Sequence, residues 1–349
     1  MKDRQRAPAL SPRRRRLSLI VIGCLLAGST AAALGQPGAQ ERRYTVAFAN
    51  LTEEPGVTLE GTGFTGREVR ESFVLASRRL SIDLVFYDNQ RDAARALANA
   101  EDAIARKVDL YVQYHRDEPS NAVIADRLKA AGIPVLAVNY PVPAAPLYTV
   151  DNLAAGRIAG DALGQFGTRA WRNLPLATVI IGALAAQDDR IPERVQGVME
   201  GLRRHLPTAR VIMLDTQGDP SRVAPLLGRV LAAQPSAKIL IAATDDATAL
   251  ASKSVLEATG RLADAGIVSH GVDRSVHGGM NERKEIDPSN RGSVLIGSVA
   301  FFLDRYGYDI LPLALRMLRG EGVPPRTTTR HILITAANVF VEYPPYDMN

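Results

Sequence analysis

The sequence predicts an α/β protein with two similar doubly wound lobes, each built on a parallel sheet. Short apolar runs, typical of strands buried on both faces, alternate with amphipathic helical segments. This alternation implies right-handed crossovers and parallel strands. The same series begins again after Asn152, and a chain of 349 residues is long enough for two domains.

The first series is organised around the stretch from Asp126 to Gly156. Gly132 ends an amphipathic helix there, because glycine readily adopts the positive φ found at helix ends. The apolar run 133–138 follows as a buried strand and ends at the polar pair Asn139–Tyr140. We expect strands at residues 44–51, 82–87, 109–113 and 133–138, and helices at 67–80, 92–106 and 123–131.

The second series repeats the pattern with one more strand. Its apolar runs have the length of strands and its longer segments carry apolar residues at helical spacing. The final segment, residues 331–341, is expected to be extended. We expect strands at 177–182, 209–215, 238–243, 266–272 and 293–299, and helices at 156–166, 192–205, 222–233, 248–259 and 304–319.

Polar and aromatic side chains follow most of these strands. Ligands of open parallel sheets bind beyond the carboxyl ends of the strands. Carboxylates and amides pair with hydroxyl groups, and arginine binds bidentately. In the first half this rule selects Asn50, Thr52, Glu53, Asp88, Tyr114, His115, Asn139 and Tyr140. In the second half it selects residues 187–194, including Arg190 and Arg194, then Thr244, Asp245, Asp246 and Asp273; one of the two adjacent aspartates could instead cap the next helix.

Residues 1–35 have the features of an export signal. The basic segment 13–16 precedes the apolar run 17–26, and cleavage is expected near Ala33 or Gly35. The apolar run is shorter than the roughly 20 residues that a spanning helix needs. Residues 21–24 resemble a lipoprotein box, but a plain apolar position is favoured for Cys24 because the apolar run continues beyond it. The pair Arg15–Arg16 loosely resembles a twin-arginine signal, so the sequence does not decide between the Sec, Tat and lipoprotein routes.

The charge and the cysteine count of the remaining chain exclude several functions. Residues 1–35 contain seven of the 42 basic residues and one of the 37 acidic residues, which leaves 35 basic against 36 acidic. A nearly neutral body has no electrostatic footprint for nucleic acid. Without Cys24 the mature chain has no disulfide and no thiolate. The five histidines lack metal-ligand spacing and no G-x-S-x-G motif occurs, so we expect no catalytic residue, metal or cofactor.

One motif supports an alternative function. Residues 61–66 match the G-x-G-x-x-G dinucleotide fingerprint, and Asp88 ends the second predicted strand. That chemistry requires the glycines directly after the first strand, whereas residues 52–60 intervene here. An exported nicotinamide-dependent oxidoreductase therefore remains an alternative, beside a Gly-rich binding loop or a plain connecting loop.

The segment "AGIPV" at residues 131–135 and the pair Asp151–Asn152 resemble the type I periplasmic sugar-binding proteins, relatives of the lactose-repressor core. The resemblance extends from about Tyr44 to the C-terminus. It implies a three-segment hinge, with crossings near Asn152, Ala300 and Arg326. The implied lobes are residues 42–152 with 302–326, and residues 153–301 with 327–349.

The resemblance also implies roles for individual residues. Arg194 and Gly197 match an R-x-x-G motif whose arginine holds the ligand, and Asp273 matches a ligand aspartate in "G-F-D". Thr244–Asp245 stands where the family has "N-D", Asn139–Tyr140 stands where it often has "D-R", and Phe301 lies near the hinge, where a polar ligand residue often sits. The aromatic pair after the first strand is missing, so Phe64 is the expected replacement for stacking.

The resemblance, together with the export signal, implies a solute-binding protein in the periplasm. It would bind a small polar ligand, a sugar above all, and present it as a monomer to the permease of an ABC importer. Closure about the hinge would bring both lobes to the ligand. A ligand sensor that docks on a membrane receptor is a second alternative. The sequence does not identify the ligand or separate transport from sensing.

Overall fold

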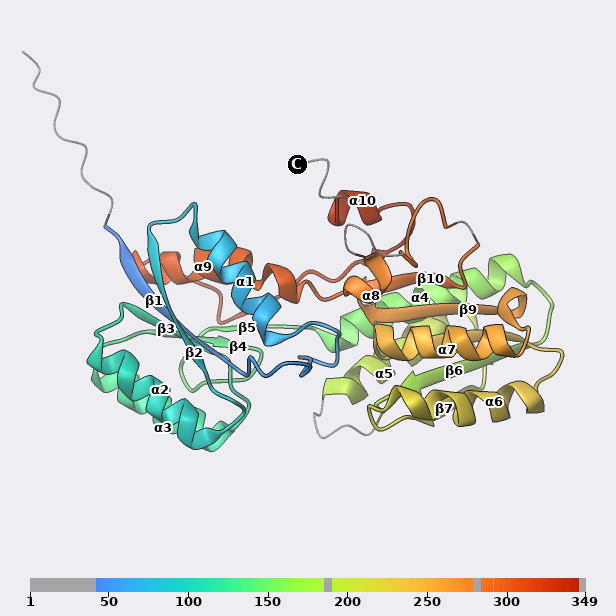
Figure 1. The fold of residues 1–349 in the computed structure, drawn as a ribbon, viewed down its shortest axis with the longest axis horizontal. Helices are drawn as coiled ribbons and strands as arrows, with labels where there is room; N and C mark the ends of the chain where they lie inside the picture. The colour runs from blue at the N-terminus through green and yellow to red at the C-terminus, as the bar shows by residue number, and fades with distance from the viewer. Residues whose placement is uncertain (1–41, 185–189, 279–283, 291, 345–349) are drawn as a thin grey trace, which may run out of the picture. The chain divides into compact units, whose positions relative to one another are not determined.

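The structure is a computed structural model that describes residues 42–184, 190–278, 284–290 and 292–344, with backbone alone at 190 and 191. The predicted signal peptide lies outside the described residues. Two sheets, in which parallel pairings predominate, carry helices on both faces (Figure 1). The predicted fold class is therefore confirmed. Among the described helices, none combines the length and the apolar character needed to cross a membrane.

The first lobe contains segments from both ends of the described chain. Its strands are β1 (Tyr44–Asn50), β2 (Ile82–Asp88), β3 (Leu110–Gln113), β4 (Val135–Val138), β5 (Leu147–Thr149) and β11 (Arg326–Thr328). Its helices are α1 (Gly66–Ser77), α2 (Ala93–Ala105), α3 (Glu118–Ala130) and α9 (Tyr306–Leu318). The strand order is β11-β5-β4-β3-β1-β2, and all described pairings in this sheet are parallel.

Strand β1 shows why helices cover both faces of this sheet. Side chains alternate along a strand, so neighbouring residues face opposite sides. Val46 and Phe48 belong to the core shared with α1 and α9, whereas Ala47 and Ala49 belong to the core shared with α2 and α3. Phe48 stacks on Phe73 of α1 with a ring-centroid separation of 4.0 Å. Figure 1 shows α1 and α9 on one side of the sheet and α2 and α3 on the other.

The second lobe repeats this architecture. Its strands are β6 (Leu176–Gly182), β7 (Val211–Asp215), β8 (Lys238–Ala243), β9 (Ala265–Gly271), β10 (Leu295–Ala300) and β12 (Leu333–Ile334). Its helices are α4 (Asn152–Ala170), α5 (Arg190–His205), α6 (Val223–Ala233), α7 (Asp246–Ala258), α8 (Arg274–His277) and α10 (Val339–Glu342), with 3₁₀ turns η1 (Pro220–Arg222) and η2 (Leu262–Asp264). The order is β12-β10-β9-β8-β6-β7, with β12 antiparallel to β10.

The chain passes between the two sheets three times. It crosses between β5 and α4, between β10 and the 3₁₀ turn η3 (Leu303–Arg305) that precedes α9, and between β11 and β12. The first crossing is short because Asp151 is the N-cap of α4 and its carboxylate accepts the backbone N–H of Ala154 at 2.9 Å. The start of α4 is therefore fixed directly at a crossing point.

The structure differs from the predicted elements at several places: β11 and α8 were not predicted, and α1 ends at Ser77 rather than at residue 80. Four further differences have a physical explanation. Helix α3 begins at Glu118 rather than 123, because Asp117 caps it and Pro119 occupies its first turn. Helix α4 begins at Asn152 rather than 156, for the capping reason given above. Strand β5 was not predicted, since the proline-rich segment around it obscured a three-residue run. The last segment is not one extended strand but the two-residue β12 followed by α10.

Candidate ligand-binding site

A hairpin between β1 and α1 is the main feature at the carboxyl edge of the first sheet. We define the β1–α1 hairpin as residues 58–65, which are paired through an antiparallel bridge between Thr58 and Thr65. Leu59 donates its N–H to the carbonyl of Phe64 at 2.8 Å, and both side chains are buried. Thr62 donates its N–H and its hydroxyl to the Leu59 carbonyl at 2.9 and 2.7 Å. These contacts give the tip of the hairpin a defined shape.

The side chains predicted after β1 support this hairpin. Asn50 donates its amide to the carbonyl of Gly66 at 2.8 Å, and Thr52 accepts the N–H of Glu54 with its hydroxyl at 3.2 Å. Glu53 pairs with Arg70 of α1 at 2.9 Å. Phe64 is buried in the first-lobe core, so its ring is packed rather than exposed for stacking in this structure.

A buried polar network joins the hairpin to the ends of β3 and β4. Tyr114 donates its hydroxyl to the Glu60 carboxylate at 2.6 Å. Asn139, which has a positive φ of 58°, donates its amide to the hydroxyls of Tyr114 and Tyr306 at 3.1 and 3.2 Å. The half-buried ring of Tyr140 stacks on Tyr114 with centroids 6.2 Å apart. Burial, reinforced by the negative charge of Glu60, raises the pKa of Tyr114 well above its usual value, so its hydroxyl remains a donor.

His115 differs from this network because it is buried without a partner. Its side chain is 1 % exposed, and neither ring nitrogen has a hydrogen-bond partner in the described structure. Burial lowers the pKa of His115, so the ring is neutral at pH 7. A neutral imidazole offers one donor and one acceptor. Both hydrogen-bonding positions of His115 are unused in the described structure.

Asp88 has a local role in this structure. Its carboxylate accepts the N–H of Gln90 at 2.9 Å and so forms the turn after β2. Its backbone carbonyl accepts the amide of Asn99 from α2 at 3.0 Å. These contacts hold the turn and connect it to α2.

In the second lobe, Arg194 is almost completely buried, with 1 % exposure. Its Nε and Nη2 both donate to Asn152 Oδ1, at 3.0 and 2.8 Å. Its Nη1 donates to the Thr244 carbonyl at 2.5 Å, and its guanidinium carbon lies 4.4 Å from the ring centroid of Phe301. The remaining donors reach the hairpin of the first lobe, at the carbonyls of Glu60 and Gly61, each at 2.8 Å.

Two facing glycines explain how α5 presents Arg194. A Cβ atom at Gly197 would lie 2.2 Å from the carbonyl oxygen of Leu153, and one at Gly156 would lie 2.0 Å from the carbonyl oxygen of Arg194. Only glycine permits this approach of the α4 and α5 backbones. The glycine of the R-x-x-G motif therefore sets the position of α5 against α4, and with it the position of its arginine.

The aspartates of the second lobe have distinct roles. Asp245 caps α7 by accepting the N–H of Thr248 at 2.7 Å, which confirms the capping alternative for this residue. Asp246 is fully buried and accepts the hydroxyls of Ser269 and Ser298 at 2.5 and 2.7 Å, and the N–H of Asp273 at 2.9 Å. Burial, with the charge of Asp273 adding to it, raises the pKa of Asp246 to about 8.

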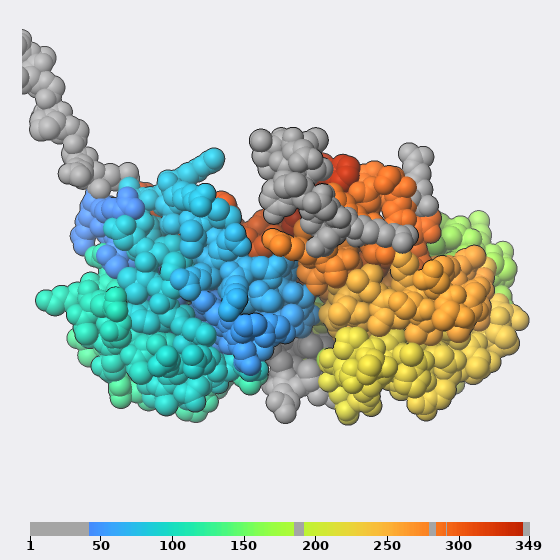
Figure 2. All heavy atoms as spheres, viewed as in Figure 1, coloured from blue at the N-terminus to red at the C-terminus, as the bar shows by residue number. Residues whose placement is uncertain are grey.

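Asp273 lies where the hairpin contacts the second lobe. It caps α8 by accepting the N–H of Ser275 at 2.7 Å, and burial raises the pKa of its carboxyl group. A Cβ atom at Gly63 would lie 1.3 Å from Oδ2 of Asp273, so the carboxylate packs directly on the Gly63 backbone. In Figure 2 the blue segment that follows β1 borders the orange segment that contains this aspartate.

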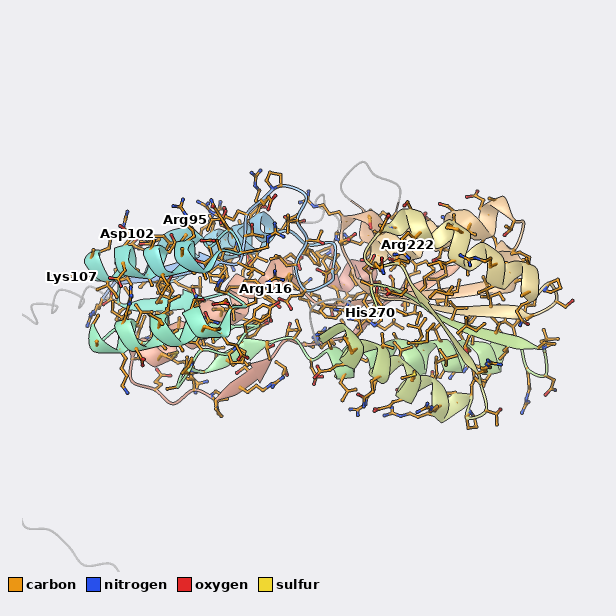
Figure 3. All side chains as sticks on the ribbon, turned by 90° about the horizontal axis from the view of Figure 1, so that it is seen from below. Arg95, Asp102, Lys107, Arg116, Arg222 and His270 are labelled. Carbon is orange, nitrogen blue, oxygen red and sulfur yellow. The ribbon has the colours of Figure 1, made fainter. Side chains whose placement is uncertain are left out.

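His270 completes the buried surroundings of Arg194. Figure 3 labels it near the end of β9. Its Nδ1 lies 2.8 Å from the Ala243 carbonyl oxygen, and its ring contacts Phe301 edge-on with centroids 6.3 Å apart. Burial, with the charge of Arg194 contributing, lowers the pKa of His270 to about 3. The ring is therefore neutral and adds no charge beside the guanidinium.

The structure thus brings most predicted residues together but uses many of them for contacts within the protein. Residues 187–189 lie outside the described residues, and of Arg190 only the backbone, at the start of α5, is described. Sequence reasoning missed Glu60, Gly63, Tyr306 and the side-chain role of Asn152. Glycine spacing at residues 61–66 marked the hairpin, but nothing local indicated that its tip contacts α5.

Close packing explains Gly63 and Gly66 of the dinucleotide-like motif, and a positive φ of 60° explains Gly61. Gly66 is the first residue of α1, and a Cβ atom there would lie 1.7 Å from the carbonyl oxygen of Thr52. Thr65 caps α1 and forms a capping box with Glu68. The hairpin separates the end of β1 from this helix, which is not the strand–turn–helix connection that pyrophosphate binding uses. Among the described residues, no group of three or more His, Cys, Asp or Glu side chains could hold a metal ion.

Comparison with known proteins agrees with this architecture. The solute-binding protein from Actinobacillus succinogenes 130z with bound D-allose has a TM-score of 0.65 and 13% identity, covering 85% of this chain and 99% of that one. The corresponding protein from Bacillus halodurans C-125 with bound myo-inositol has a TM-score of 0.61 and 20% identity, covering 86% of this chain and 96% of that one. A solute-binding protein from Mycobacterium smegmatis with bound glycerol has a TM-score of 0.63 and 18% identity, covering 86% of this chain and 96% of that one.

A search of curated protein sequences found no match. The profile of the family described as periplasmic binding protein domain matches residues 56–321, which is most of the chain. The match includes four of the six strands of the first sheet, five of the six strands of the second, the hairpin tip and two of the three crossings. The chain therefore belongs to the periplasmic binding protein domain family and has its two-lobed type I fold.

Proposed function

We propose that this protein is a periplasmic solute-binding protein that captures a sugar or polyol at the facing carboxyl edges of its two sheets. The observation that carries the proposal is membership of the periplasmic binding protein domain family. Structural neighbours with bound D-allose, myo-inositol and glycerol support a ligand rich in hydroxyl groups. The protein would act as a monomer and deliver its ligand to the permease of an ABC importer.

The ligand contacts that we propose come from both lobes. In the first lobe, His115 has two ring nitrogens without a protein partner and the half-buried Tyr140 presents an aromatic face. In the second lobe, Asp273 carries a carboxylate, and the residue is 8 % exposed. A carboxylate accepts two hydroxyl groups, a neutral imidazole pairs with one, and an aromatic ring covers the apolar face of a sugar. This combination suits a small neutral polyol.

A thermal unfolding screen tests this proposal. The chain from Gln36 onward is heated with a panel of pentoses, hexoses, polyols and nicotinamide nucleotides. A ligand at roughly 100 times its Kd adds about 2.7 kcal/mol of stability. For a protein of this size that corresponds to a midpoint rise of about 5–11 °C, at roughly 2–4 °C per kcal/mol. A rise with one sugar or polyol supports the proposal, whereas a rise with a nicotinamide nucleotide alone refutes it in favour of the oxidoreductase.

Export is the second part of the proposal. The periplasmic family implies an exported protein, and residues 1–35 supply the features of a signal. We expect the mature N-terminus to follow Ala33 or Gly35. Intact-mass analysis of protein from the periplasmic fraction measures this directly. A full-length mass, or a lipidated Cys24, would contradict the proposed cleavage.

A further inference from the structure

The guanidinium of Arg194 is saturated by protein groups. An arginine side chain has five N–H donors. One Nε–H and one Nη2–H go to Asn152 Oδ1, the second Nη2–H to the Glu60 carbonyl, and the two Nη1–H groups to the carbonyls of Gly61 and Thr244. Protein groups thus accept all five donors. We propose that Arg194 and the β1–α1 hairpin form an interlobe latch, which holds the two lobes in contact while no ligand is bound.

The hairpin side of the latch is fixed to the first lobe. Glu60 and Gly61 have positive φ angles of 55° and 60°, which turn the chain sharply at the tip. The Glu60 carboxylate accepts a hydrogen bond from the hydroxyl of Tyr114 at 2.6 Å. Leu59 and Phe64, on either side of the tip, are buried in the core. The two carbonyl groups that receive Arg194 are therefore positioned by first-lobe contacts that do not involve the second lobe.

The arginine side of the latch is fixed to the second lobe and to a crossing point. Val195 and Val198 of α5 are buried in the core, and Gly197 holds α5 against α4. Asn152, which accepts two of the five hydrogen bonds, is the first residue of α4 and directly follows the first crossing. Arg194 thereby connects the hairpin of the first lobe to α5 and to the start of α4 in the second lobe. The two lobes change their relative positions when a hinge of this type opens.

A second contact beside Arg194 reinforces the latch. The Asp273 carboxylate packs on Gly63 so closely that a Cβ atom there would lie 1.3 Å from Oδ2. The backbone nitrogen of Gly63 also approaches Gly271, 3.7 Å from the position that a Cβ atom would take there. The hairpin tip therefore contacts the second lobe at two separate places. This role for Arg194 differs from the ligand contact that the family resemblance implies, and it leaves ligand recognition to other groups.

A distance measurement without ligand tests the latch. The full chain carries Cys24→Ser, which removes its one cysteine. Spin labels are then attached at Arg95→Cys on α2, an exposed first-lobe position labelled in Figure 3, and at Ala224→Cys, an exposed position on α6 of the second lobe. Electron–electron double resonance reports the distribution of distances between the lobes. We expect one narrow distribution for the protein with an intact latch.

Arg194→Ala should broaden the distribution and shift it to longer distances, and Arg194→Lys should do the same because an ammonium has three donors and no planar fork. The matched control is Arg204→Ala, which removes an arginine from the same helix whose partner, Asp161, lies within the second lobe. An unchanged distribution in Arg194→Ala, or a broad distribution already present with an intact latch, overturns the proposal.

Gly63→Ala keeps the test decisive if the Arg194 variants fail to fold. It leaves Arg194 in place, adds one methyl group against Asp273 and should produce the same opening. Its control is Gly228→Ala on α6, where a Cβ atom meets nothing within 4 Å and the distribution should stay narrow. A narrow distribution in Gly63→Ala would refute the latch. All samples are free of ligand, so the result does not depend on whether the protein binds a sugar.

Discussion

Replacing Gly197 by alanine should destabilise the second lobe, although alanine is the better helix former. The added Cβ would lie 2.2 Å from the Leu153 carbonyl oxygen and 2.8 Å from the Arg157 nitrogen, whereas ordinary contacts begin at 3.4 Å. Both neighbours are backbone atoms of α4, so relief requires the two helices to move apart. Overpacking of this kind costs about 1–3 kcal/mol. Alanine returns about 0.5–1 kcal/mol through helix propensity and a more restricted unfolded chain.

The expected net loss is therefore on the order of 1–2 kcal/mol, or roughly 2–8 °C in the unfolding midpoint. Urea unfolding followed by the fluorescence of Trp171 measures it, because this single tryptophan ends α4 and packs against Phe166. Gly228→Ala is the matched control, since a Cβ there meets nothing within 4 Å and should stabilise by about 0.5–1 kcal/mol. If Gly197→Ala is as stable as the parent, the close-packing explanation of the R-x-x-G glycine is wrong.

Three further predictions concern single side chains of the site. Asp273→Asn keeps the acceptor that caps α8 but loses the charge, so isothermal titration with ligand should show an affinity about 10–100-fold weaker. The control is Asp219→Asn, which changes the cap of η1 in the same way and should bind ligand as the parent does. The pKa of Asp246 is raised to about 8 in the folded state, so its contribution to stability is full below pH 4 and is lost as the pH rises towards 8. The urea unfolding midpoint of the parent should therefore fall over this pH range, and that of Asp246→Asn should not. Parallel pH profiles of the parent and the variant would contradict the buried carboxyl group. His115→Leu removes a buried imidazole that has no hydrogen-bond partner in the described structure, so the melting temperature without ligand should stay equal or rise. The rise in melting temperature that ligand causes in the parent should be absent. If the variant still binds ligand, His115 is not part of the site.

Most of the fold could be predicted from the sequence because its signals are local. Buried strands such as β8, Lys238–Ala243, are continuous apolar runs, and Gly132 marks the end of a helix unambiguously. Helix starts were less accurate where capping was overlooked, as at Asp117 and Asp151. Strand β5 has three residues and owes its place to neighbours on both sides, β4 and the distant β11. Such a strand is defined by tertiary pairing rather than by its own composition.

The site was less predictable because its decisive contacts are non-local. The rule that ligands bind at the carboxyl ends of strands selected Tyr114, Asn139 and Asp273 from local sequence alone. It could not show that Arg194 meets carbonyl groups more than a hundred residues away in sequence. Every residue has a backbone carbonyl group, so the residue type at position 60 did not indicate that its carbonyl accepts a hydrogen bond from Arg194. The glycine spacing at residues 61–66 was the one local signal for the hairpin.

The three crossings of the chain also set the order in which this protein can fold. Helix α9 packs on α1, where the Gly307 N–H donates to the Ser72 hydroxyl at 2.9 Å, and β11 completes the sheet edge beside β5. Both arrive after every strand from β6 to β10 has been made. The first half of the chain therefore emerges from the ribosome without the segments that cover Phe48 and Phe73. Contacts this distant in sequence form slowly. The first lobe can therefore complete its core only late in synthesis, and its apolar side chains stay exposed for longer.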